Sequence, residues 1–277
     1  MLHFTLNNAL QIPAIGFGTY KASRDAMSLA IDAGYRYFDT AAFYGNEHDL
    51  GRAVAQSGIP REDFFIASKV WKTDMGYKAA HESFSRTLEN LGTDYVDVFL
   101  IHWPRPDIES KNWRELDLET WRAMEELHSQ GKIRALGLSN FLPYHAENII
   151  NNSRVFPAVA QIEFHAGHTQ AFALNYYREK NILVQAWSPI GRGRVLNDEL
   201  ITELAAKYRV SPVQVCLAFC LSEGVMPLPK ASSTERLREN LQAVNITLER
   251  EDIMRLENMP PVGWSGEHPD RARVKIS

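Results

Sequence analysis

The stretch Gly34-Tyr35-Arg36-Tyr37-Phe38-Asp39-Thr40-Ala41-Ala42-Phe43-Tyr44 decides the expected fold of this chain. Within it, an apolar, strand-like run is followed by an acid and a phenol, Asp39 and Tyr44. Two further strand-like runs end in the same way, the first on Lys69 and the second on His102. Side chains at the ends of successive strands converge if the strands are parallel neighbours, as in a barrel whose functional groups gather at the C-terminal strand ends. The stretch therefore predicts an α/β fold, a (β/α)8 barrel.

Strand-like and helix-like segments alternate along the chain, which supports this interpretation. Strict alternation implies parallel strands, and about eight strands favour a closed barrel. An open, doubly wound sheet remains the alternative. The expected strands are residues 15–18, 35–38, 64–68, 95–101, 133–138, 158–162, 183–186 and 225–228. The expected helices include residues 25–33, 47–56, 77–90, 118–130 and 234–243.

The two ends of the chain fall outside this alternation. Alternating apolar residues on either side of Asn7-Asn8 predict a β-hairpin that covers one end of the barrel. The last stretch, from Pro260 onward, is polar and irregular, which predicts a tail draped over the domain. No linker-like or low-complexity segment divides the chain, so residues 1–277 are expected to form one barrel domain.

Composition narrows the functional classes. The chain has 277 residues, 45% of them hydrophobic, and a net charge of −4, which gives no support to nucleic-acid or anionic-membrane binding. Cys216 and Cys220 lie in an apolar helical stretch and are expected to be buried free thiols. The N-terminus lacks the pattern of a signal peptide, and no apolar run approaches the ~20 residues of a membrane span. We expect a soluble, cytoplasmic monomer that acts on a small molecule.

The four polar residues at the strand ends have complementary chemistry. A free phenol has a pKa of about 10, and Lys69 beside Tyr44 would favour the phenolate and lower that pKa. Asp39 would keep the ammonium charged and oriented, and His102 would hydrogen-bond a substrate oxygen. Taken singly, each residue is more often a cap, a core residue or a solvated charge. Together they predict a site that donates a proton to a carbonyl.

A series of motifs resembles the aldo-keto reductase family, in particular the bacterial branch that includes diketogluconate and methylglyoxal reductases. After the opening stretch, the matching motifs are residues 66–71, 100–104, 137–141, 161–163, 188–191 and 230–240. The resemblance implies a TIM barrel that reduces aldehydes or ketones with NADPH. It also implies that Tyr44 is the general acid, with Asp39, Lys69 and His102 as the other catalytic residues. The implied substrate pocket consists of Tyr20, Phe43, Trp71, His102 and Trp103.

The resemblance also implies where the cofactor lies, since no G-x-G-x-x-G motif is present. Ser139, Asn140 and Gln161 would hold the nicotinamide carboxamide, and Trp187, where the family usually has Tyr, would stack on the ring. The loop of residues 188–193 would pass the pyrophosphate. Further implied contacts near the cofactor are Gly18, Thr19, Tyr20, Asp39, Ser188, Pro189, Ile190, Gly191 and Gly193.

The adenosine end of the cofactor would lie after the last strand. Lys230, Ser232 and Arg236 surround the start of a helix, which is an arrangement that suits an anion. By resemblance this site holds the 2′-phosphate, which favours NADPH over NADH. Glu239 and Asn240 match residues that contact the adenine.

Two other functions remain open at this point. Lys69 or Lys230 could form an imine in a Schiff-base lyase on the same barrel. A nonenzymatic, nicotinamide-sensing subunit is the second alternative. His165 and His168 lie three apart but have no further ligand cluster nearby, so no metal is expected.

Overall fold

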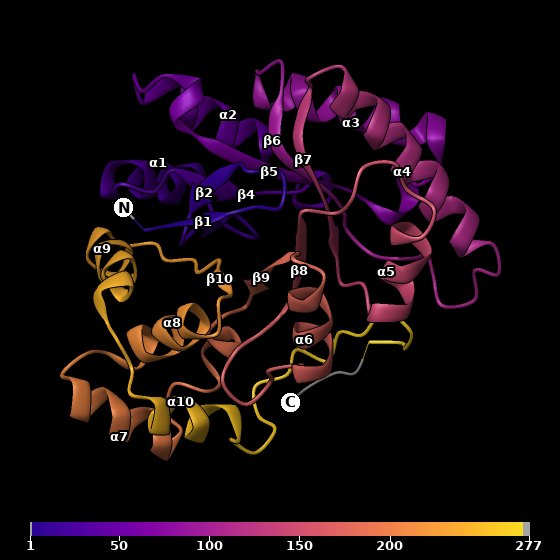
Figure 1. Ribbon diagram of the computed structural model, residues 1–277. Coiled ribbons are helices and arrows are strands. Elements are labelled where there is room, and N and C mark those ends of the chain that lie inside the picture. The colour runs from indigo at the N-terminus through magenta and orange to yellow at the C-terminus, as the bar shows by residue number, and fades with distance from the viewer. Residues whose placement is uncertain (1, 274–277) are drawn as a thin grey trace.

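Eight parallel strands follow one another around a single sheet in chain order, from β3 to β10, with helices on the outside (Figure 1). The structure is a computed structural model and describes residues 2–273. The strands are β3 (Phe17–Gly18), β4 (Tyr37–Asp39), β5 (Phe65–Val70), β6 (Val96–Ile101), β7 (Ile133–Ser139), β8 (Val159–Glu163), β9 (Leu183–Trp187) and β10 (Met226–Pro227). The helices are α1 (Arg24–Ala33), α2 (Glu47–Gln56), α3 (Tyr77–Leu91), α4 (Trp113–Ser129), α5 (Pro143–Ile150), α6 (Ala171–Glu179), α7 (Glu199–Tyr208), α8 (Pro212–Ser222), α9 (Thr234–Gln242) and α10 (Arg250–Glu257).

Two backbone hydrogen bonds join the first strand region to the last. The amide of Gly16 donates to the carbonyl of Pro227, and the amide of Gly18 donates to that of Pro229, both at 3.1 Å. A Cβ on Gly18 would lie 3.1 Å from the carbonyl oxygen of Leu228, so glycine permits this close approach. The predicted closed barrel is thereby confirmed over the open sheet.

The predicted N-terminal hairpin is confirmed as β1 (His3–Thr5) paired antiparallel with β2 (Gln11–Pro13). Its turn side chains donate to backbone carbonyls near the starts of β7 and β8. Leu6 and Ile12 of the hairpin are buried and share a cluster with residues of the barrel interior. Those residues include Tyr37, Val98, Leu100 and Met226. The hairpin therefore fills the N-terminal end of the barrel and leaves the C-terminal strand ends for a site.

The helix α4 begins at Trp113, earlier than the expected start at residue 118. Trp113 and Asp117 are buried whereas Arg114 and Glu115 are exposed, so one face of the added turn packs inward. In α8, Cys216 and Cys220 are buried free thiols, as predicted. Within residues 2–273 no single helix is long and apolar enough to cross a membrane; the bent pair α7–α8 passes by length and composition only.

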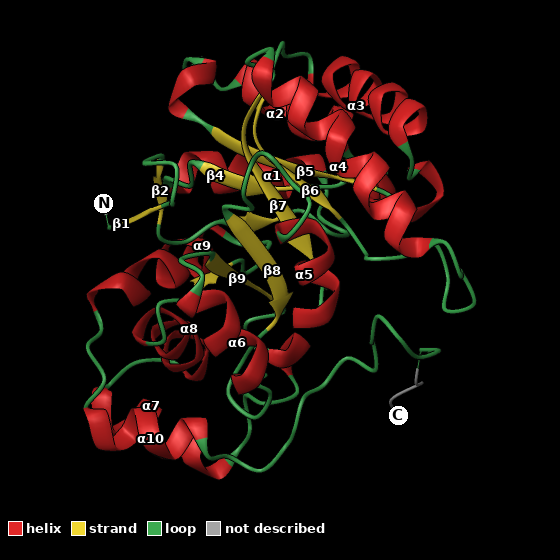
Figure 2. Cartoon of the chain, turned by 45° about the vertical axis from the view of Figure 1, so that its right-hand side comes forward, coloured by secondary structure: helices red, strands yellow, loops and turns green. Residues whose placement is uncertain are grey.

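The chain after α10 has no helix or strand up to residue 273. This C-terminal tail, residues 260–273, leaves α10, passes the end of β8 and reaches α5 across the C-terminal rim of the barrel (Figure 2). Near its start, Ser265 donates from Oγ to Glu163 at the end of β8, at 2.7 Å. Farther along, Asp270 pairs with Arg105 at 2.9 Å and lies 3.1 Å from Nε2 of His145. The predicted tail thus lies beside the strand ends that carry the candidate site.

Candidate active site

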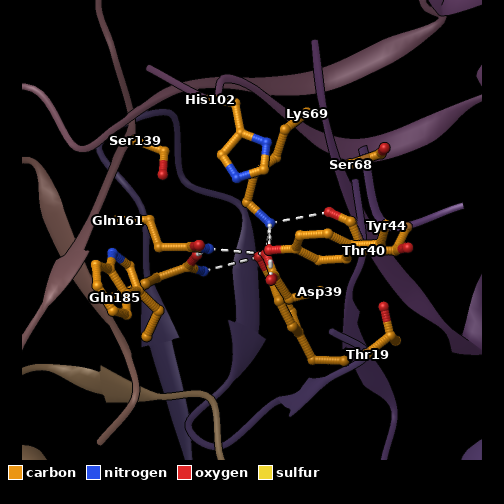
Figure 3. Close-up of polar contacts among 12 residues, drawn as sticks. Thr19, Asp39, Thr40, Tyr44, Ser68, Lys69, His102, Ser139, Gln161 and Gln185 are labelled. Atoms are coloured by element: carbon orange, nitrogen blue, oxygen red, sulfur yellow. Dashed lines mark hydrogen bonds and ion pairs between the residues drawn. The ribbon is translucent and has the colours of Figure 1, made fainter. Parts of the chain in front are cut away.

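Lys69 lies at the centre of the four residues that follow the early strands (Figure 3). Its Nζ donates to the two carboxylate oxygens of Asp39 at 2.8 and 2.7 Å. It also donates to the backbone carbonyl of Thr40 at 2.9 Å and to Oη of Tyr44 at 3.3 Å. The imidazole of His102 lies above this group, with its ring centroid 5.7 Å from that of Tyr44. The structure therefore brings together all four residues that the sequence singled out.

Local backbone contacts explain why these side chains meet. Asp39 ends β4 and pairs in register with Ala67 of the neighbouring β5. Lys69 lies two residues beyond Ala67, on the same face of that strand. Tyr44 lies in the short 3-10 helix η1 (Ala42–Tyr44), which ends at Gly45 with a left-handed φ of 68°. That conformation favours glycine. The turn after β4 thereby brings the phenol back toward the lysine.

Burial controls the charges in this group. Lys69 is 0% exposed, and burial lowers its pKa, against the opposing effect of Asp39. The pKa of Tyr44 lies well above its ordinary value because of burial and the negative charge of Asp39. The net direction is therefore opposite to the lowering expected from Lys69, because burial and the charge of Asp39 are the largest causes. Asp39 contacts the ammonium through both oxygens and offsets its charge, so Tyr44 is held as a neutral phenol.

His102 is also neutral. It is 7% exposed, and burial lowers its pKa well below the usual value, with smaller contributions from the cations Lys69 and Lys72. Its ring packs edge-on against Trp71, with centroids 5.0 Å apart. A neutral imidazole has one donor and one acceptor nitrogen, so it can hydrogen-bond a carbonyl oxygen without adding charge.

A cavity of about 920 Å³ opens above these residues. Asp39, Tyr44 and His102 line it, whereas Lys69 lies behind them. All five residues expected in the substrate pocket line the same cavity, namely Tyr20, Phe43, Trp71, His102 and Trp103. Phe43 and Trp71 stack at 3.9 Å and form an apolar wall beside the imidazole. This volume is in the range of small-molecule sites.

The residues expected to hold the nicotinamide line the opposite side of the cavity. They are Ser139, Asn140, Gln161 and Trp187. The indole Nε1 of Trp187 donates to Oδ1 of Asn140 at 2.8 Å, which fixes the plane of the ring. The amide nitrogen of Asn140 donates to the carbonyl of His102 at 2.9 Å. Asn140 thus ties three strand ends together in addition to facing the cavity.

Gln185 is a residue that the sequence did not single out. Gln161 donates to Oδ1 of Asp39 at 2.7 Å and to Oε1 of Gln185 at 3.2 Å. Gln185 in turn donates to the hydroxyl of Tyr37 at 2.7 Å. This chain of buried hydrogen bonds crosses the barrel and orients the carboxylate of Asp39. A polar residue facing inward from the middle of β9 was the available signal.

The remaining cofactor contacts expected from the sequence lie partly at the cavity wall and partly outside it. Gly18, Ser188, Pro189, Ile190, Gly193 and Lys230 line the cavity. Lys230, Ser232 and Arg236 are exposed, and Arg236 lies in the first turn of α9, whose N-cap is Ser233. Thr19 and Gly191 are buried and do not line the cavity, and Glu239 lies outside it. Asn240 is 4% exposed, so its side chain is turned away from solvent.

Residues of the turn after β5, the loop after β6 and the C-terminal tail also line the cavity. These are Lys72, Arg105, Asp107, Ile108, Glu267, His268, Pro269 and Arg271. The described residues 2–273 contain no group of three or more metal-ligating side chains. His165 and His168 instead form a turn, joined by their backbones and with Nδ1 of His165 bonded to the carbonyl of Ala166.

Comparison with known proteins decides the family. Residues 14–259 match the model of the Aldo/keto reductase family. The chain belongs to the aldo-keto reductase family. Glyoxal reductase of Bacillus subtilis is 37% identical over 270 residues, which span 96% of this chain and 95% of that protein. The expected family and the oxidoreductase class are thereby confirmed.

Solved structures of the family have the same fold. An aldo-keto reductase from Brucella melitensis is 36% identical with a TM-score of 0.87, over 92% of this chain and 98% of its own. An aldo-keto reductase complexed with NADPH is 31% identical with a TM-score of 0.87, over 99% and 90% of the two chains. Neither the lyase nor the sensing alternative gains support from these matches or from the geometry of the site.

Proposed function

We propose that this aldo-keto reductase uses NADPH to reduce small aldehydes or ketones to alcohols, with Tyr44 as the proton donor. The observation that carries the proposal is the contact of 3.3 Å between Nζ of Lys69 and the phenol of Tyr44, at the wall of the cavity. The matched structure that contains NADPH supports the choice of cofactor.

The residues of the second half of the barrel fit a phosphorylated nicotinamide dinucleotide. Trp187 presents an indole whose plane is fixed, which suits stacking with a flat ring. The amide nitrogen of Gln161 is engaged by Asp39, so its oxygen is left to accept from a carboxamide. The exposed Lys230 and Arg236 beside the N-terminus of α9 suit a phosphate. When bound, NADPH supplies a hydride to the carbonyl carbon.

Tyr44 completes the reduction by giving its proton to the carbonyl oxygen. Because its pKa is raised, the phenol is protonated at neutral pH and is available as an acid. As the proton leaves, Lys69 stabilises the developing phenolate through the hydrogen bond that is already formed. Tyr44 then regains a proton from solvent. Neutral His102 hydrogen-bonds the carbonyl oxygen and orients it toward Tyr44.

The test is loss of NADPH absorbance with a panel of aldehydes and ketones, for the wild type and for Tyr44→Phe. The proposal requires turnover by the wild type and its loss in the variant. Full activity of Tyr44→Phe would show that the assigned proton donor is wrong. Binding of NADPH without oxidation by any carbonyl would instead favour the sensing function. Cytoplasmic location, a monomeric state and a single domain over residues 1–277 stay predictions.

A further inference from the structure

Lys72 is a half-buried cation on the substrate side of the cavity. It begins the 3-10 helix η3 (Lys72–Asp74), directly after the β5 strand and Trp71. Its Nζ lies 5.4 Å from the ring centroid of Trp71, which is itself in edge contact with His102. Among the ion pairs within residues 2–273, none includes Lys72. A partly desolvated charge without a counterion is costly unless a ligand supplies one.

The other charges on this side of the cavity are offset or exposed. Arg105 pairs with Asp270 at 2.9 Å. Arg273 pairs with Glu267 at 3.0 Å. Three further charged residues of the wall, Lys21, Asp107 and Arg271, are exposed, so solvent and salt screen them. The uncompensated charge closest to the reacting groups is therefore positive and lies on Lys72.

The charge of Lys72 reaches the reacting centre. It is one of the causes that lower the pKa of His102, which places the ammonium within electrostatic range of the imidazole. Trp71 contacts both the ammonium and the imidazole, and Phe43 stacks on Trp71; such an apolar surface reduces screening by water. A substrate whose carbonyl contacts His102 would extend along this wall toward Lys72.

We propose that Lys72 selects carbonyl substrates that carry an anionic oxygen group, a carboxylate or a phosphate, a few atoms from the carbonyl. This inference rests on the proposed reductase function and adds the substrate class. The anion would pair with the ammonium while the carbon chain between the two polar groups lies against Trp71. Charge complementarity of this kind acts chiefly on specificity.

The experiment compares matched substrates that differ in charge. Succinic semialdehyde is paired with methyl 4-oxobutanoate, and glyceraldehyde 3-phosphate is paired with glyceraldehyde. The wild type should prefer an anionic member by about tenfold in kcat/KM, the size of one charge-assisted contact. The first pair tests a carboxylate and the second a phosphate, so the pair that shows the preference names the anion.

Three variants separate the charge of Lys72 from its packing. Lys72→Met should lose the preference and change kcat/KM for the neutral members by less than about twofold. Lys72→Arg should keep most of the preference, because the charge is retained. Arg271→Gln is the matched control, since it removes an exposed cation of the same wall, and it should leave most of the preference intact.

Equal kcat/KM for charged and neutral members in the wild type would overturn the inference. A Lys72→Met variant whose kcat/KM falls equally for the charged and the neutral member of a pair would overturn it as well. Either result would leave the proposed function intact, provided that the neutral aldehydes are reduced and that Tyr44→Phe is inactive. Failure of the proposed function would instead appear as no NADPH oxidation with any of the four substrates.

Discussion

The strand ends of the first half of the barrel and those of the second half are built differently. At the ends of β4 and β5, Asp39 and Lys69 are 4% and 0% exposed and hydrogen-bond each other. After β10, Lys230 and Arg236 are exposed, and Lys230 contacts backbone carbonyls of residues 20 and 21. The first region has its contacts formed within the protein, whereas the second presents charges to solvent.

This difference indicates that the first region is organised for chemistry and the second for binding. A buried ion pair holds its geometry because removing either partner leaves an uncompensated charge. Such rigidity suits groups that must transfer a proton at a fixed distance. Exposed cations beside a helix N-terminus cost little in the free protein and remain able to receive an anion.

The largest expected effect comes from removing the proton donor of the first region, Tyr44. Tyr44→Phe removes the proton donor and should lower kcat about a thousandfold. The Kd for NADPH, measured by fluorescence titration, should stay within about twofold, because the second region is intact. A parallel loss of NADPH binding would mean that Tyr44 belongs to the binding region as well.

Breaking the buried ion pair should reduce stability strongly. Lys69→Met leaves Asp39 buried without its cation, and the free energy of unfolding should fall by about 3–5 kcal/mol in urea denaturation. Combining it with Asp39→Asn should recover part of that loss, because the uncompensated charge is gone. Lys230→Met is the control from the second region and should change stability by less than about 0.5 kcal/mol. Equal losses for Lys69→Met and Lys230→Met would remove the contrast between the regions.

The second region should respond in cofactor affinity rather than in stability. Arg236→Ala is expected to raise the Kd for NADPH about tenfold and to leave that for NADH unchanged. The physical reason is the loss of one charged contact to a phosphate that NADH lacks. Arg238→Ala, an exposed arginine of the same helix, is the matched control and should affect neither. Equal weakening of both cofactors by Arg236→Ala would argue against a 2′-phosphate contact.

The smallest effect is expected in the pH dependence. The lowered pKa of His102 means that it gains a proton only well below pH 6.5. The raised pKa of Tyr44 means that it loses its proton only well above pH 10. Reduction should therefore show a flat kcat/KM from about pH 7 to about pH 9. A step near pH 6.5 that His102→Asn abolishes would show that the imidazole titrates normally.

The sequence determined the closed barrel and the residues at its strand ends. Alternation of apolar strands and amphipathic helices implies parallel neighbours, and the polar residue that ends each strand then falls on one rim. That is why Asp39, Tyr44, Lys69 and His102 could be grouped before any coordinates. Asp39, Lys69 and His102 lie at the ends of their own strands and Tyr44 lies in the turn after β4, so each position is local information.

Only the tertiary structure decided how these residues are charged and what surrounds them. Gln161 and Asp39 are 122 residues apart, and Gln185 and Tyr37 are 148 apart, so no local pattern predicts their hydrogen bonds. The raised pKa of Tyr44 depends on burial and on the negative charge of Asp39. Burial is a property of packing between distant segments. For the same reason, the isolation of Lys72 on the cavity wall became visible only in the fold.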